Sequence, residues 1–324
     1  MMFKHCLFCL EPLHDTAVEY HEACSKSFFG SIQPPTLDYT MDQMDELAKT
    51  VVSSHIAVTG VQPKLSLSLI HDTLKKVNRK RLTVVGALGG NFILKPPTVH
   101  YPELPANEHL TMKMASLFGI ETVPCSLIRL GSGELAYITK RIDRTDDGLK
   151  IHMLDMFQIT DAVDKYKGSM ERVGKAIAEY SSNTLLDKLR YFEVVLFCYL
   201  TGNNDMHLKN FSLFKHLDNW TLSPAYDLLN VSLANPKDTE EMALTIEGKK
   251  RRLSRKMFER FGLGLGLNSK QIESVFGRFQ KEIPAAFELC ERAFLSPENK
   301  DGYLEIFRLR CAKLSIKVKT YFWL

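Results

Sequence analysis

Hydrophobic residues recur with two different periods in the two halves of this chain of 324 residues. Between residues 55 and 145 short apolar runs bounded by turn residues are typical of β-strands, and Leu65 to Leu69 alternates Leu with Ser as a half-buried strand does. The strands predicted there cover residues 65–69, 82–85, 91–95, 123–129 and 135–141, with one helix from 105 to about 118. From residue 150 onward the apolar spacing is helical. The helices predicted there cover residues 154–163, 173–180, 185–200, 254–261, 269–281, 284–294 and 304–321, and a short strand covers 220–222.

These patterns divide the chain into a β-rich small lobe at residues 55–145 and a helical large lobe at residues 146–324. The predicted fold class is therefore α+β, with two lobes. Residues 31–54 begin as a linker with two adjacent prolines and continue as a helix, because Met44 and Leu47 begin an apolar helical spacing.

The first 30 residues carry two short pairs of metal-ligand residues. Cys-x-x-Cys is followed by His-x-x-Cys, and a short turn brings each pair onto one metal ion. Three thiolates and one imidazole give Zn²⁺ a complete tetrahedral shell, so such a metal would be structural. The alternative is a small apolar cap with free thiols, and the sequence leaves both open. The residues concerned are Cys6, Cys9, His21 and Cys24.

A polar loop at residues 202–212 follows a strongly apolar run, and it contains Asp205 and, five residues later, Asn210. A second carboxylate, Asp227, follows. Protein kinases use such groups in this order: the first Asp accepts the proton of the substrate hydroxyl, and the Asn and second Asp hold Mg²⁺ on the ATP phosphates. Mg²⁺ takes oxygen ligands in octahedral geometry, which an amide and a carboxylate from two loops can supply. Each half alone is more typical of a turn capped by its Asp, but the order and spacing of both favour the kinase.

Six segments resemble the HipA family of serine/threonine kinases, and within it the shorter HipT-like toxins. The resemblance implies a bilobed protein-kinase-like fold and phosphate transfer that depends on ATP and Mg²⁺. The eukaryotic kinase signature is met only in part: His207 stands where those kinases carry Lys, Tyr226-Asp227-Leu228 replaces Asp-Phe-Gly, and no Gly-x-Gly-x-x-Gly loop is present. The six segments are TGVQPKLSL (59–67), GNFILKP (90–96), ANEHLTM (106–112), KRIDR (140–144), GNNDMHLKNFSLF (202–214) and SPAYDLLN (223–230).

The resemblance assigns further roles on the nucleotide. Lys95 ends a strand and Glu108 lies at the start of the following helix, and in kinases such a Lys contacts the phosphates and pairs with a helix Glu. The alternatives are an exposed strand end for the Lys and a capping carboxylate for the Glu. His207 would steady the γ-phosphate or the loop. The segment from Lys140 to Ile142 would receive adenine, with Ile142 packing on the base. We expect these side chains and the catalytic Asp, Asn and Asp to act on one nucleotide.

The loop that ends at Lys64 is the phosphate-side loop by resemblance. Gly60 allows close approach of the backbone to phosphate, and Thr59 and Lys64 lie beside it in the sequence. In this family a hydroxyl residue of the loop is autophosphorylated, and the added charge would repel ATP or reorder the loop. HipT-like relatives carry Ser-x-Ser before the loop Gly, where this chain has Ala57 and Thr59. Thr59 is therefore the first candidate for autophosphorylation and Ser54 the second, unless Thr59 is an ordinary turn hydroxyl.

Composition limits the classes of partner and the cellular compartment that we expect for this chain. A net charge of +4 and a pI of about 8.5 are too weakly basic to indicate nucleic-acid binding by themselves. The apolar run before the polar loop is about ten residues long, whereas a membrane span needs roughly 20. No signal peptide is visible, and seven Cys is far below disulfide density. We expect a cytoplasmic protein of a bacterium or, after delivery by a signal-less secretion system, of a host cell, with no membrane partner.

By resemblance, the leading function is the toxin of a HipBA- or HipBST-like toxin–antitoxin system. This kinase would phosphorylate itself and a translation protein such as an aminoacyl-tRNA synthetase, with or without tRNA. Its partners would be a HipB-like DNA-binding antitoxin and a small HipS-like protein, which supplies a subdomain that the start of this chain looks too short to contain. Two alternatives stay open. One is an ATP-binding pseudokinase or adaptor that holds nucleic acid or protein on its Cys/His segment and on basic runs at 75–81 and 249–256. The other is a small-molecule kinase, which uses the same groups.

Overall fold

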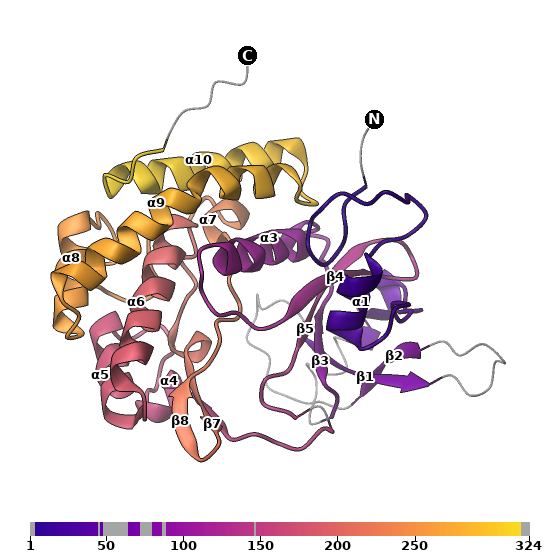
Figure 1. Ribbon diagram of the computed structural model, residues 1–324, viewed down its shortest axis with the longest axis horizontal. Coiled ribbons are helices and arrows are strands. Elements are labelled where there is room, and N and C mark those ends of the chain that lie inside the picture. Colours follow the sequence, from indigo (N-terminus) through magenta and orange to yellow (C-terminus); the bar gives the residue numbers. More distant parts are fainter. Residues whose placement is uncertain are drawn as a thin grey trace. The chain divides into compact units, whose positions relative to one another are not determined.

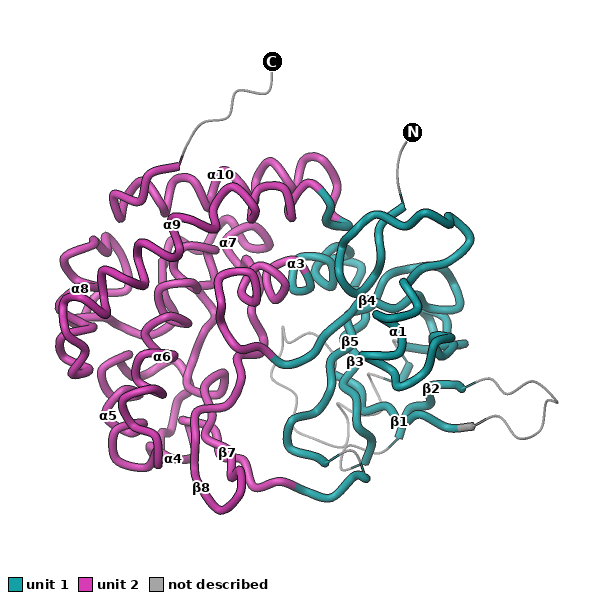
Figure 2. The backbone as a smooth tube through the Cα atoms, in the orientation of Figure 1, with its two compact units in different colours: residues 1–109, 123–150, 292–294 teal, residues 110–122, 151–291, 295–324 magenta. Residues whose placement is uncertain are grey.

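The computed structural model describes residues 4–44, 46–47, 64–71, 80–85, 89–145 and 147–318. The chain forms two compact units, which Figure 2 shows in teal and magenta. Unit 1 comprises residues 1–109, 123–150 and 292–294, and unit 2 comprises residues 110–122, 151–291 and 295–324. Each unit buries its own apolar core.

Unit 1 is built on a five-stranded antiparallel sheet in the order β2-β1-β3-β5-β4 (Figure 1). Leu67, Leu82 and Leu94 lie on one face of it and are fully buried, as the period of two requires. All five strands predicted for this part of the chain are confirmed, as is the helix between the third and fourth of the predicted strands. The elements are β1 Leu65–His71, β2 Lys80–Val85, β3 Phe92–Lys95, β4 Cys125–Arg129, β5 Leu135–Lys140, α1 Glu22–Phe29 and α3 Leu104–Leu117, of which α3 continues into unit 2.

The N-terminal segment of unit 1 packs on this sheet through α1, a helix that the sequence did not predict. Phe28 and Phe29 place their rings 5.7 and 6.2 Å from the ring of Phe92, the first residue of β3. The backbone N–H of Leu127 in β4 donates to the carbonyl of Leu7 at 2.9 Å. Residues 41–44 and 46–47 are helical, as predicted for the segment that follows the linker.

Unit 2 is organised around α6, in which every side chain from residue 191 to residue 200 is buried. A three-stranded antiparallel sheet, β6-β7-β8, pairs Leu213 with Leu154 on one side and with Leu222 on the other. None of the helices in the described part of the chain is both long and apolar enough to span a membrane. The elements are β6 Met153–Asp155, α4 Met156–Ile159, α5 Met170–Tyr180, α6 Thr184–Leu200, η1 Leu208–Asn210, β7 Ser212–His216, β8 Asn219–Leu222, α7 Val231–Ala234, α8 Arg255–Gly264, α9 Ser269–Glu291 and α10 Pro297–Lys313.

The helix predicted over residues 154–163 is wrong for most of its length. Residues 153–155 are a strand, and only residues 156–159 are helical. Asp155 begins that turn with a capping box, because its carboxylate accepts from the Gln158 N–H and the Gln158 side chain accepts from the Asp155 N–H. The helical spacing failed because Leu154 pairs with Leu213, a partner 59 residues later in the sequence that only the folded chain brings close.

Two predicted helices, 269–281 and 284–294, are a single helix, α9, with Pro284 inside it. A proline in a helix interior costs about 3 kcal/mol. The apolar stripe on both sides of it, including Phe279 and Ile283, is buried and offsets that cost. The last helix, predicted at 304–321, instead covers 297–313, because Ser296 caps it and Pro297 occupies the first helical position.

Candidate functional site

The polar loop that the sequence singles out leaves α6 through a tight turn. Gly202 adopts φ 71°, and a Cβ there would lie 2.9 Å from both Asn230 Oδ1 and Ile306 Cγ2. Only glycine fits without a shift of these neighbours. The N–H and Oγ of Ser232, in the four-residue helix α7, each donate to the Gly202 carbonyl at 3.0 Å. These contacts fix the direction in which the chain enters the loop.

Asp205 and Asn210 are held by hydrogen bonds within the loop. The His207 N–H donates to the Asp205 carbonyl at 2.9 Å, and the Asn210 N–H donates to the His207 carbonyl at 2.9 Å, which forms the short helix η1. Asn210 Nδ2 also donates to the Asp205 carbonyl at 3.2 Å. This contact uses the nitrogen of the amide, whereas Mg²⁺ binds the oxygen of an amide. Hydrogen bonds to the backbone of the loop thus hold the Asp205 carboxylate and the Asn210 amide at a set separation.

Tyr166 contacts this loop from the segment before α5. Its hydroxyl donates to Asp205 Oδ1 at 2.8 Å, and its ring meets that of His207 edge to face with centroids 5.1 Å apart. Burial, followed by the hydrogen bond to Asp205, raises the pKa of Tyr166, so the hydroxyl keeps its proton. No sequence pattern pointed to this residue, because Tyr166 precedes Asp205 by 39 positions and lies in an irregular segment.

Burial favours the neutral form of the His207 imidazole. Burial lowers its pKa below 6.5, in spite of the opposing charges of Asp205 and Asp227. Its Nδ1 is buried, and among the described residues no group forms a hydrogen bond with it. A neutral imidazole carries no charge and donates from one ring nitrogen only. It would therefore attract a phosphate less strongly than the Lys ammonium that eukaryotic kinases carry.

The loop that carries Asp227 is fastened to the first loop by Tyr226. The Tyr226 hydroxyl lies 2.6 Å from Ser212 Oγ and donates to the Lys209 carbonyl at 3.1 Å. Asp227 itself adopts φ 61°, the left-handed conformation that non-glycine residues rarely occupy. All of these residues belong to unit 2. The structure therefore brings the two predicted loops together, and the link between them was not predicted.

In unit 1, Lys95 and Glu108 form an ion pair. Lys95 Nζ lies 2.5 Å from Glu108 Oε1, and the two side chains are only 6% and 1% exposed. The Lys95 ammonium also lies 5.3 Å from the centroid of the Tyr137 ring on β5. Neither residue is the exposed strand end or helix cap that the sequence left open. The expectation that this pair and the unit 2 loops act on one nucleotide stays a prediction.

Of the remaining residues predicted to contact the nucleotide, some are described by the structure and others are not. Lys64 is exposed just before β1, Lys140 ends β5, and Ile142 is half-buried. Arg141, between the last two, forms two parallel hydrogen bonds to the Asp143 carboxylate at 2.8 and 2.7 Å. Burial works to raise the pKa of Asp143, but the arginines beside it outweigh burial and lower the pKa. The predictions for Ser54, Thr59 and Gly60 concern positions outside the described residues.

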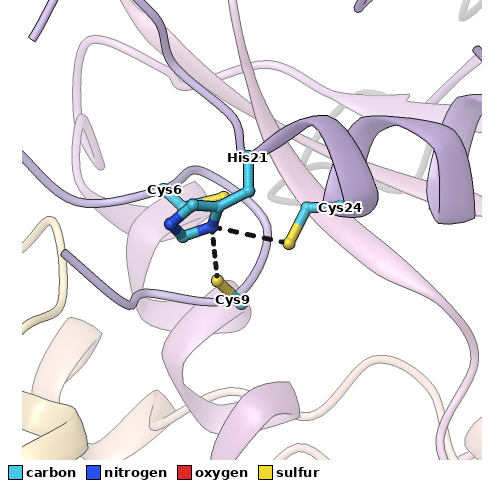
Figure 3. A group of neighbouring side chains, drawn as sticks. All are labelled: Cys6, Cys9, His21 and Cys24. Atoms are coloured by element: carbon cyan, nitrogen blue, oxygen red, sulfur yellow. Dashed lines mark hydrogen bonds between the residues drawn. The ribbon is translucent and has the colours of Figure 1, made fainter. Parts of the chain in front are cut away.

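The four metal-ligand residues of the N-terminal segment lie together (Figure 3). Their donor atoms are all within 4.8 Å of one another, so the cluster could hold a metal ion. A hydrogen bond from Cys9 lowers the pKa of Cys6 to about 4, and backbone N–H groups of Cys9, Phe8 and His21 act in the same direction against burial. The same hydrogen bond raises the pKa of Cys9.

Comparison with known proteins identifies the family. The HipA-like C-terminal domain matches residues 56–287, which is more than half of the chain. The chain belongs to the HipA-like family. This HipA-like chain is 26% identical over 291 residues to a protein of Haemophilus influenzae that has a provisional kinase designation, covering 81% of the chain and 82% of that protein. It is 26% identical over 254 residues to the serine/threonine-protein kinase toxin HipA of Shewanella oneidensis, covering 71% of the chain and 56% of HipA.

Solved structures show the same fold. The HipA-like chain matches HipA in a complex of S. oneidensis HipA, HipB and operator DNA with a TM-score of 0.67 at 24% identity, covering 80% of this chain and 65% of that one. It matches the proinflammatory kinase CtkA of Helicobacter pylori with a TM-score of 0.52 at 13% identity, covering 69% of this chain and 87% of that one. The predicted α+β, protein-kinase-like fold is therefore confirmed, and the relatives place the chain in a family of kinases.

Proposed function

We propose that this chain is a serine/threonine protein kinase that uses ATP and Mg²⁺. Asp205 orients the substrate hydroxyl and accepts its proton, and Asn210 and Asp227 hold the metal. Lys95, kept in place by Glu108, binds the phosphates. Mg²⁺, when bound, supplies charge neutralisation on the phosphates. The protein's contribution is then mainly positioning and electrostatic stabilisation.

The observation that best supports this proposal is the hydrogen bond from the Tyr166 hydroxyl to the Asp205 carboxylate. The carboxylate already accepts a hydrogen bond from the Tyr166 hydroxyl at 2.8 Å, which is the contact that a general base makes with its substrate. The buried Nδ1 of His207, which has no partner among the described residues, would find one in a phosphate oxygen. Both groups belong to the loop that also carries Asn210, so the donor set suits a nucleotide with its metal.

The same proposal includes the biological setting. S. oneidensis HipA is named a toxin, and its structure is a complex with HipB and operator DNA. We take the chain to be the toxin of a similar toxin–antitoxin system, with a HipB-like antitoxin and a small HipS-like partner, in the cytoplasm of a bacterium or of a host cell. Its substrate would be a translation protein such as an aminoacyl-tRNA synthetase. A synthetase from the producing organism, tested with and without its tRNA, is the first substrate to assay.

Phosphate transfer can be measured with γ-labelled ATP on the purified chain and a protein substrate. We expect incorporation that requires Mg²⁺ and falls at least about 100-fold in Asp205→Asn, since a positioned general base contributes about 10²–10⁴. A similar loss is expected in Asp227→Asn, which would weaken the hold on the metal. Asp218→Asn is the matched control, because Asp218 is also an Asp with positive φ, 66°, but is 94% exposed on the turn between β7 and β8.

Two outcomes would contradict the proposal. Full transfer by a correctly folded Asp227→Asn variant would remove the metal assignment. Binding of ATP by the wild-type chain without transfer to itself or to any protein would leave an adaptor in its place. Phosphopeptide mass spectrometry of the expressed chain adds an independent check, with phosphate expected at Thr59 or, failing that, at Ser54, and absent from the Asp205→Asn variant.

A further inference from the structure

The Cys/His cluster of unit 1 has the geometry of a closed zinc site. With Zn–S near 2.3 Å and Zn–N near 2.0–2.1 Å, a tetrahedral shell places sulfur and nitrogen about 3.6 Å apart. His21 Nδ1 lies 3.4 Å from Cys9 Sγ and 3.7 Å from Cys24 Sγ. Cys6 completes the set, and the largest separation among the four donors is within 4.8 Å. The four donor atoms would need to move only slightly closer together to surround one Zn²⁺ ion.

The hydrogen bond on the far side of the imidazole orients His21 as a ligand. His21 Nε2 lies 3.1 Å from the carbonyl oxygen of Pro12, which only accepts hydrogen bonds, so Nε2 carries the proton. Nδ1 then presents its lone pair toward the sulfurs of Cys9 and Cys24, as Figure 3 shows. Metal-binding histidines characteristically donate their other nitrogen to a carbonyl or carboxylate in this way.

The donor set also selects the metal and its role. Three soft sulfur ligands and one imidazole favour Zn²⁺ over Mg²⁺ or Ca²⁺, which prefer oxygen. Four protein ligands leave no open position for water or substrate, so the ion is structural. On binding, the thiols release their protons to solvent and coordinate as thiolates. A free-thiol cap would have no need of an imidazole whose nitrogen faces two sulfurs.

The segment that holds these ligands contacts both elements that carry the Lys95–Glu108 ion pair. His109, the next residue after Glu108 on α3, has its Nε2 3.2 Å from the carbonyl of Phe8, inside the Cys6–Cys9 turn. On the other side, His21 is the N-cap of α1 and Cys24 lies in its first turn. Phe28 and Phe29 of α1 pack on the first residue of β3, the strand that ends at Lys95. A metal that ties the Cys6–Cys9 turn to the start of α1 therefore braces α3 and β3 together.

We infer that Cys6, Cys9, His21 and Cys24 bind one structural Zn²⁺, and that this ion keeps β3 and α3 in the arrangement that pairs Lys95 with Glu108. The metal site stands on the cluster alone. Its consequence for nucleotide binding rests on the kinase activity proposed above.

The metal is tested on the full-length chain, purified under reducing conditions and supplied with Zn²⁺. Elemental analysis is expected to find about one zinc ion per chain. His21→Ala and Cys24→Ala should lose most of it, whereas His21→Cys, which keeps four ligands, and Cys125→Ala, which removes a buried cysteine of β4 outside the cluster, should retain it. Replacement by Co²⁺ should give thiolate-to-metal charge-transfer absorption in the wild type and not in Cys24→Ala.

A wild-type chain that holds no zinc under these conditions, or one that holds a disulfide between two of the cluster cysteines, overturns the site. So does a His21→Ala variant that is folded and still binds zinc as the wild type does. Because His21→Cys preserves the shell, it separates loss of metal from loss of fold if the alanine variants prove insoluble.

Hydrogen exchange measured by mass spectrometry tests the brace. Removal of zinc by a chelator should speed amide exchange in peptides from β3 and α3 by about tenfold or more, while α9 of unit 2 serves as the internal control. Zinc that leaves without any change in β3 and α3 overturns the brace. Neither metal content nor exchange depends on catalysis. A chain that passes both tests and transfers no phosphate would contradict the proposed kinase and leave the zinc site standing.

Discussion

Removing one charge of the Lys95–Glu108 pair should destabilise unit 1 far more than removing both. The two side chains are 6% and 1% exposed, so Glu108→Gln leaves a buried ammonium and Lys95→Met leaves a buried carboxylate. Breaking a buried pair from one side costs about 3–5 kcal/mol, because the remaining charge has lost both water and partner. The double variant Lys95→Met/Glu108→Gln buries no charge, and neutral replacements of similar volume are often close to neutral in stability.

The assay must report on unit 1. The chain has two tryptophans, of which Trp220 lies on β8 of unit 2 and Trp323 lies outside the described residues, so tryptophan fluorescence would follow the wrong unit. Hydrogen exchange of peptides from β3 and α3 reads the stability locally. A loss of about 3 kcal/mol corresponds to exchange that is roughly 100-fold faster, since every 1.4 kcal/mol is a factor of ten.

We therefore expect exchange about 100-fold faster than wild type in each single variant, and slower exchange in the double variant than in either single one. If Lys95 binds the phosphates as proposed, the double variant should transfer no phosphate although its stability is regained, because it lacks the ammonium. Unchanged exchange in Glu108→Gln, or a double variant as unstable as the sum of the singles, would refute the reasoning that these two charges depend on one another.

Three further predictions concern unit 2. Tyr166→Phe removes the hydroxyl that would compete with the substrate hydroxyl for Asp205. Loss of a competing hydrogen bond worth roughly 1 kcal/mol should lower the KM for the protein substrate about fivefold and leave kcat unchanged. A fall in kcat would contradict this. The lowered pKa of His207 means that, below pH 6.5, the unfolded chain binds a proton that the folded chain refuses. Stability should therefore fall as pH falls through that range, and urea unfolding of His207→Gln should show a shallower dependence. Asp187, fully buried, accepts from Ser181 Oγ at 2.5 Å and from the Leu222 N–H at 2.8 Å, so Asp187→Asn should lower the free energy of unfolding by about 1–3 kcal/mol in fluorescence-monitored urea titrations, and an unchanged midpoint would argue against a role for these bonds.

The sequence was sufficient wherever the signal was local. The strands of unit 1 follow from local patterns such as the alternation from Leu65 to Leu69, and the helix before Asp205 follows from its continuous apolar run. The strand directly after the loop, β7, was not predicted. The order of Asp, Asn and Asp also predicted which loops would lie side by side, as the contacts of Tyr226 with Ser212 and Lys209 show.

What escaped prediction depends on partners distant in the sequence. Nothing near Leu154 says that Leu213 will draw it into a strand, and nothing near Tyr166 says that its hydroxyl will meet Asp205. The predicted break in the helix at Pro284 was wrong for the opposite reason. A proline is a strong local signal for a helix end, but burial of the apolar side of α9 outweighs it. The cysteine spacing left a metal site and a free-thiol cap both open, and the contact of His21 with the Pro12 carbonyl, which bears on that choice, was not predicted.

The left-handed backbone at Asp227 has a consequence for how this protein can change over evolutionary time. Asn and Gly enter that conformation as readily as Asp does, so replacement by either leaves the local geometry intact. If Asp227 holds Mg²⁺ as proposed, a lineage could lose that ligand in one substitution and still produce a folded chain. Among homologues in one genome, solubility and melting temperature would then not separate active copies from inactive ones, whereas the residue at this position would.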